Sequence, residues 1–197
     1  MCSSDLAARP VFIVGGGVVI AGGESELIEL AEKLNAPVAT TISGQGSISE
    51  EHPLAVGVVG SNGGTPETRS IVDQADLVVF VGCRAGSVTT ERWRHPVPGK
   101  VKVIHIDVDP RVPGTNYRVD VQIVSDAKLA LEALNASLEG TKRPLDAAAI
   151  QKAKETKFAK FRKLAESNDA PIKPERVVAT LSRTLDADAV VVADPGT

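Results

Sequence analysis

The chain has 197 residues with 43% hydrophobic and 24% charged side chains, which is typical of a globular protein and excludes a largely disordered one. Its formal net charge of −3 and its few aromatic side chains, one Trp, one Tyr and four Phe, exclude a nucleic-acid-binding surface. No apolar run reaches the roughly 18 residues that a membrane span needs. Cys2 and Cys83 form neither a disulfide framework nor a thiolate metal motif. We therefore expect a cytoplasmic protein with no membrane or nucleic-acid partner.

The first folded element is expected just after the amino terminus. Residues 1–8 lack the positive and apolar stretches of a signal peptide, and we interpret them as an artefact or linker. Residues 11–14 predict a strand and residues 15–17 a glycine loop. A helix follows, because its apolar residues recur at helical spacing: Leu27, Leu30, Ala31 and Leu34.

The middle of the chain continues this alternation. Residues 37–40 predict a second strand. The following stretch as far as Gly64 predicts a loop, because it contains too many glycines for a helix. Thr65 and Pro66 have the residue types of a helix start. Residues 76–81 and 101–106 are nearly unbroken apolar runs, as in central strands of a parallel sheet that helices cover on both faces.

A last strand and helix complete the predicted domain. Residues 119–124 form the strand, and Ser125 is expected to cap a helix that carries Leu131, Leu134 and Leu138. Strand and helix thus alternate throughout residues 9–139. This pattern predicts an α/β domain with a Rossmann-like parallel sheet and helices on both faces.

The remaining residues form two further predicted parts. Residues 140–173 are rich in lysine around a single apolar stripe, which predicts a linker helix. Residues 174–197 begin with a helix at Pro174 and continue with an apolar strand at residues 189–193. We interpret this part as the truncated start of a second α/β domain.

Candidate binding residues stand at the ends of the predicted strands, where open α/β sheets bind ligands. Residues 15–17 lack the third glycine of the dinucleotide fingerprint, so either a tight turn or a ligand contact explains them. Arg84 either contacts a phosphate or adenine, or pairs with a surface carboxylate. Asp107 and Asp109 either accept ribose hydroxyls or form a turn. The spacing of nucleophiles, bases and histidines predicts no catalytic site and no metal site.

Several stretches together resemble one family, the central domain of thiamine-diphosphate-dependent enzymes of the acetolactate synthase type. The resemblance covers about residues 9–138 in order and register, and it rests on the following segments: residues 9–17, 37–46, 52–54, 75–84, 105–110 and 125–128. Residues 174–197 resemble the start of the carboxyl-terminal domain of the same family.

The resemblance implies an enzyme of three domains that uses thiamine diphosphate and Mg²⁺ on a 2-keto acid, as a transferase or lyase. The partners of this chain would be the amino- and carboxyl-terminal domains of the same polypeptide, in a homodimer or homotetramer. Without those domains we expect no catalysis, and the chain would serve as a scaffold with a possible FAD or ADP site.

Central domains of this family hold FAD, ADP or nothing. By position, the residues that match nucleotide-contacting positions are Gly16, Gly17, Thr40, Gly82, Arg84, Asp107 and Asp126. Flavin-binding members carry the stretches G-A-R-F-D-D-R and G-M-H-G, whereas this chain lacks both acids and the second arginine at residues 82–87 and lacks the histidine at residues 60–63. These departures favour an empty or ADP-type pocket over FAD.

Two other functions are alternatives to this one. A sirtuin-like enzyme that consumes NAD has a related topology, but it needs a four-cysteine zinc site that two cysteines cannot form. A stand-alone nucleotide-binding protein with a Rossmann-like sheet is the alternative, although the apolar strand predicted at residues 189–193 would then have no sheet to join.

Overall fold

The computed structural model describes residues 7–192. The chain divides into two compact units, Met1–Lys154 and Glu155–Thr197, and each is described by itself. The predicted domain boundaries at residues 139 and 173 stay a prediction, because the division into compact units reflects packing and does not define the domains of a family.

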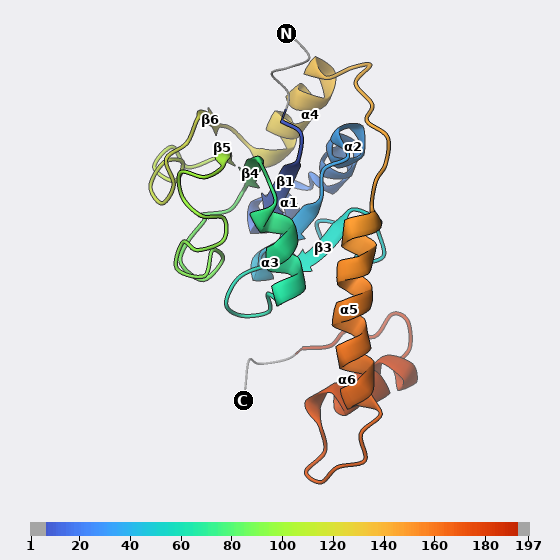
Figure 1. Ribbon diagram of the computed structural model, residues 1–197. Helices are drawn as coiled ribbons and strands as arrows, with labels where there is room; N and C mark the ends of the chain where they lie inside the picture. Colours follow the sequence, from blue (N-terminus) through green and yellow to red (C-terminus); the bar gives the residue numbers. More distant parts are fainter. Residues whose placement is uncertain (1–6, 193–197) are drawn as a thin grey trace. The chain divides into compact units, whose positions relative to one another are not determined.

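The first unit is built on a six-stranded sheet in which every neighbouring pair is parallel (Figure 1). The strand order is β3-β2-β1-β4-β5-β6, which is the order of a Rossmann fold. The strands are β1 (Pro10–Val14), β2 (Val38–Thr40), β3 (Ala55–Val58), β4 (Leu77–Val81), β5 (Lys102–Asp107) and β6 (Val121–Val124). The predicted α/β class with a Rossmann-like parallel sheet is therefore confirmed.

Helices cover both faces of this sheet. They are α1 (Gly16–Ala21), α2 (Glu24–Leu34), α3 (Pro66–Asp73), α4 (Ala127–Ser137) and the first residues of α5 (Ala148–Ala165), with a short 3-10 helix η2 (Ile42–Gly44). On one face, Phe12 of β1 lies with Leu30 of α2 and Leu134 of α4. On the other, the next residue, Val11, lies with Ile71 of α3 and Ile150 of α5. All five residues of β1 are buried as a result, as expected for a strand covered from both sides.

Three local predictions were wrong, and each has a physical reason. Gly16 and Gly17 do not stay in a loop: they begin α1, which ends at Gly22 in the left-handed conformation (φ 62°). β3 lies in the stretch that we expected to be irregular, where Gly57 adopts φ 99° next to a register shift between β2 and β3. Asp126, not Ser125, caps α4, because its carboxylate accepts the backbone N–H groups of the first turn.

The second unit contains the end of α5 and the helix α6 (Pro174–Thr184), which begins at the predicted Pro174. The predicted strand at residues 189–193 is not formed in residues 189–192, and residue 193 lies outside the described residues. A strand needs a hydrogen-bonded neighbour, and between residues 155 and 192 the structure offers none. Val190 and Val192 are accordingly about nine-tenths exposed, at 89% and 91%. Within residues 7–192, no helix combines the length and the apolar character needed to cross a membrane.

Candidate functional site

A cleft of about 930 Å³ opens at the carboxyl ends of β1, β4 and β5. β1 connects to β2 on one side of it, and β4 follows on the other side in the sheet order. This reversal is the topological switch point at which open α/β sheets bind ligands. Five of the seven predicted binding residues line this cleft: Gly16, Gly17, Gly82, Arg84 and Asp107.

The glycines of the cleft are explained first by backbone packing. A Cβ atom on Gly17 would lie 2.6 Å from Cα of Gly82, and one on Gly15 would lie 2.8 Å from Cα of Cys83. Backbone atoms of the loops after β1 and β4 therefore touch, which only glycine permits here. The N–H groups of Gly15 and Gly17 already donate to Val81 O (2.9 Å) and Gly82 O (3.1 Å). Those two N–H groups are not available to a phosphate.

Two charged side chains on the cleft wall, Arg84 and Asp107, have groups that form no hydrogen bond or ion pair within residues 7–192. Arg84 is exposed, and its guanidinium forms no hydrogen bond or ion pair with any residue in the described range 7–192. Its backbone oxygen accepts a hydrogen bond from Asn116 at 2.9 Å. One carboxylate oxygen of Asp107 accepts the N–H of Asp109 at 3.0 Å. The other accepts no hydrogen bond from the residues that the structure describes.

Asp109 is committed to the protein instead. Its carboxylate accepts three hydrogen bonds from the Arg111 side chain, the shortest from Nη2 to Oδ2 at 2.8 Å. These bonds lower the pKa of Asp109 to about 2. Of Asp107 at the end of β5 and Asp109 beyond it, only Asp107 thus keeps a carboxylate oxygen without a hydrogen bond to any residue in the range 7–192.

Thr40 and Asp126 are not brought to the cleft wall. Thr40 is 1% exposed at the end of β2, and its Oγ1 has no hydrogen-bond partner among the residues that the structure describes. The Asp126 carboxylate is occupied by Lys128 N (2.9 Å) and Leu129 N (3.2 Å). Their assignment to a nucleotide stays a prediction.

Polar residues that the sequence did not single out also line the cleft: Thr41, Ser43, Ser87, Thr89 and Asn116. Thr41 and Ser43 follow β2, and Thr41 Oγ1 accepts the N–H of Gly44 at 3.1 Å. Because both residues follow a predicted strand, the sequence could have identified them as candidate binding residues. Asn116 lies nine residues beyond the end of β5, in a loop whose path no local pattern indicates.

Cys83 lines the cleft, and the buried His105 of β5 contacts its backbone. Burial raises the pKa of Cys83 to about 11, so its thiol keeps its proton. Burial also lowers the pKa of His105. Its Nε2 donates to Cys83 O at 2.7 Å, which fixes the proton on that nitrogen. Burial therefore disfavours the charged form of both side chains.

Comparison with known proteins gives the family. A model described as "Thiamine pyrophosphate enzyme, central domain" matches residues 5–134. The chain belongs to the thiamine pyrophosphate enzyme family. The sheet and cleft described above are its central domain.

Individual relatives agree with this assignment. The chain is 39% identical over 178 residues to the probable acetolactate synthase large subunit of Methanocaldococcus jannaschii, which covers 90% of this chain and 30% of that protein. It is 33% identical over 197 residues to acetolactate synthase isozyme 3 large subunit of Escherichia coli, covering 96% of this chain and 33% of that protein. The chain thus spans about a third of the length of these relatives.

Proposed function

We propose that this chain is the central domain of an acetolactate synthase-like enzyme, and that its cleft holds the adenosine diphosphate part of a nucleotide. The observation that carries the proposal is that one cleft contains both Arg84 and Asp107. Within residues 7–192, the Arg84 guanidinium and one Asp107 carboxylate oxygen have no bonding partner. Both occur at the switch point of the sheet, where dinucleotide folds bind their ligands.

The chemistry of the two side chains fits this ligand. A guanidinium binds phosphate oxygens through two parallel N–H groups, and a carboxylate after a strand accepts the hydroxyls of a ribose. The exposed side chains of Ile20, Ile42 and Val88 add apolar surface to the same cleft for an adenine ring. ADP and FAD share this adenosine diphosphate part. The departures at residues 60–63 and 82–87 favour an empty or ADP-type pocket over FAD, and the bonding groups of Arg84 and Asp107 favour ADP over an empty pocket.

We infer that thiamine diphosphate and Mg²⁺, which the family holds together, bind outside the described residues. Nowhere in residues 7–192 do three His, Cys, Asp or Glu side chains gather in a way that could hold a metal ion. We therefore assign both groups to other parts of a longer enzyme, the domains that precede and follow this one. There, thiamine diphosphate would supply the stabilisation of negative charge that a 2-keto acid needs to lose CO₂.

The remaining features of the proposed parent follow from its family. It would be a transferase or lyase of the cytoplasm that acts on a 2-keto acid as a homodimer or homotetramer, with this domain as a scaffold. The alternative of a stand-alone nucleotide-binding protein is not favoured, because the matching relatives are acetolactate synthase subunits over almost the whole chain.

Isothermal titration calorimetry of the 197-residue chain with ADP and with FAD tests the proposal. We expect one saturable site for ADP and no further gain with FAD. Arg84→Ala and Asp107→Asn should each weaken ADP binding by about tenfold, the effect of losing about 1.4 kcal/mol. Arg183→Ala is the matched control, since Arg183 is an exposed arginine of α6 that does not line the cleft.

The two nucleotides separate the outcomes. Tighter binding of FAD than of ADP, with a yellow protein, would identify a flavin site. No binding of either nucleotide at millimolar concentration would contradict the proposal.

A further inference from the structure

One wall of the cleft is a loop in an unfavourable conformation. This wall loop, residues 84–97, follows β4 and contributes Arg84, Gly86, Ser87, Val88 and Thr89 to the cleft. Immediately after these residues, three consecutive non-glycine residues adopt left-handed backbone conformations: Glu91 (φ 50°), Arg92 (φ 59°) and Trp93 (φ 59°). Each such residue is unfavourable for an L-amino acid. The turn therefore persists only if contacts outside it hold it in place.

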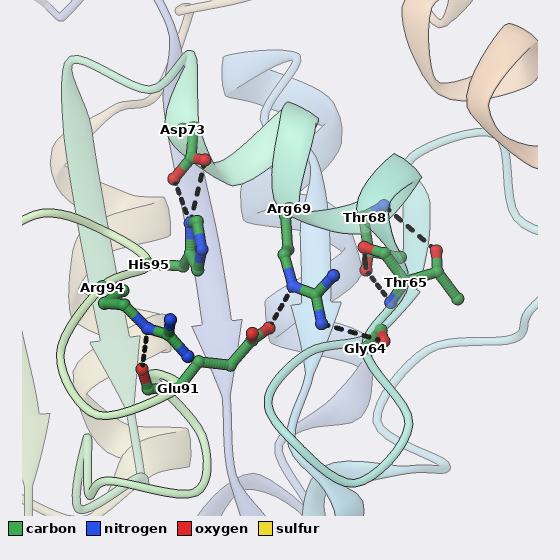
Figure 2. A network of polar contacts seen from close by, with 8 residues as sticks. All are labelled: Gly64, Thr65, Thr68, Arg69, Asp73, Glu91, Arg94 and His95. Carbon is green, nitrogen blue, oxygen red and sulfur yellow. Dashed lines mark hydrogen bonds and ion pairs between the residues drawn. The ribbon is translucent and has the colours of Figure 1, made fainter.

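The strongest of these contacts is an ion pair with α3. Arg69 of α3 donates through Nε to the Glu91 carboxylate, and the Glu91 side chain is only 9% exposed (Figure 2). The backbone oxygen of Glu91 accepts a hydrogen bond from Arg94 Nε at 2.9 Å. Both the side chain and the backbone at the start of the left-handed turn are thus fixed.

Weaker contacts hold the wall loop on either side of the turn. Val88 O accepts the N–H of Ser61 at 2.8 Å, and a Cβ on Gly60 would collide with that same oxygen. His95 Nδ1 lies 2.8 Å from the Asp73 carboxylate on α3 (Figure 2). α3 and the loop before it therefore hold the outer side of the cleft wall.

We propose that Glu91 is the positioning residue of the nucleotide cleft. Its carboxylate does not line the cleft. Through Arg69 it holds the left-handed turn, and the turn fixes the backbone that carries Arg84 and residues 86–89. The inference rests on the proposed nucleotide site. Glu91 has this role because its carboxylate is nearly buried and is costly to leave without a cation, which favours the single geometry in which Arg69 faces it. The Asp73–His95 pair is more exposed and therefore holds the loop less strongly.

The chain contains its own reporter of this loop. Trp93 is its single tryptophan, it belongs to the left-handed turn, and it is partly exposed. Acrylamide quenching of its fluorescence therefore reports the conformation of the wall loop without a label. Calorimetry with ADP on the same samples reports the cleft.

Glu91→Gln is the informative variant, because it removes the charge and keeps the shape. We expect greater quenching of Trp93 and ADP binding weaker by about tenfold, at a temperature where circular dichroism shows that the chain is folded. Glu91→Asp, which keeps the charge, should restore part of both signals. Glu29→Gln is the control, since it makes the same change in the exposed pair with Lys33 on α2 and should alter neither signal.

The readouts separate the possible failures. Unchanged quenching in Glu91→Gln overturns the inference, because the ion pair would not hold the loop. Increased quenching with unchanged ADP affinity also overturns it, because the loop would not position the cleft. If the unmodified chain binds no ADP, the nucleotide proposal fails and the positioning of a nucleotide by Glu91 fails with it, while quenching still shows whether the pair holds the loop.

Discussion

Replacing Gly17 by alanine sets two physical effects against each other. Gly17 lies in α1, so helix propensity alone predicts that alanine stabilises the chain by about 1 kcal/mol. The structure predicts the opposite sign. The added Cβ would lie 2.6 Å from Cα, 3.2 Å from C and 3.1 Å from O of Gly82, and all three are backbone atoms that cannot rotate away.

The size of the effect follows from these contacts. Overpacking costs about 1–3 kcal/mol, and the contact of 2.6 Å with the backbone Cα of Gly82 places Gly17 at the upper end of that range. Subtracting the gain of about 1 kcal/mol in helix propensity leaves a net loss of about 2 kcal/mol. In a unit of this size, that loss lowers the melting temperature by about 4–8 °C.

Urea and thermal unfolding followed by circular dichroism measure this difference. Gly86→Ala is the matched control, because Gly86 also lines the cleft, has no left-handed φ, and leaves open space for a Cβ. We expect Gly86→Ala to unfold like the unmodified chain or slightly later. A Gly17→Ala chain at least as stable as the unmodified one would refute the packing explanation of the cleft glycines.

Three further predictions concern single residues. Asp126→Ala removes the cap of α4 and should cost about 1 kcal/mol in urea unfolding, whereas Ser125→Ala should cost little; equal losses would show that the cap is misassigned. Because the pKa of His105 is lowered in the folded state, the unfolded chain binds its proton first. Its contribution to stability is therefore full above pH 6.5, the ordinary pKa, and is lost as pH falls below it. His105→Gln should reduce this loss between pH 7.5 and 5.5, and an unchanged pH profile would contradict it. Cys83, whose pKa is raised to about 11, should resist iodoacetamide at pH 8 in the folded chain and react in urea, as peptide mapping would show; equal reaction in both states would argue against burial.

The sheet was predictable wherever a strand is apolar on both faces. β1, β4 and most of β5 are apolar in this way, and their patterns indicated the positions of all three strands and the central place of β4 and β5. β3 was not predictable, because its Ala-Val-Gly-Val composition has little strand propensity, and neighbouring β2 supplies the pairing that forms it. Conversely, the valines of residues 190–192 have high propensity but no partner strand among the described residues of their unit.

The cleft was predictable in outline and not in detail. Arg84 and Asp107 follow strongly apolar strands, and the ends of parallel strands meet at one edge, so their meeting in one cleft could be expected. Asp126 could also have been identified as a cap, since two cap-forming residues precede α4. The Arg69–Glu91 pair could not be predicted, because it joins residues 22 positions apart through a left-handed turn of ordinary residues.

The most direct test of the nucleotide assignment is to map bound ADP on the ¹⁵N-labelled chain by NMR. We expect the amide chemical shifts to change at the carboxyl ends of β1, β4 and β5, above all near Arg84 and Asp107, and not in α6. Shifts centred on another surface, or no shifts at saturating ADP, would contradict it.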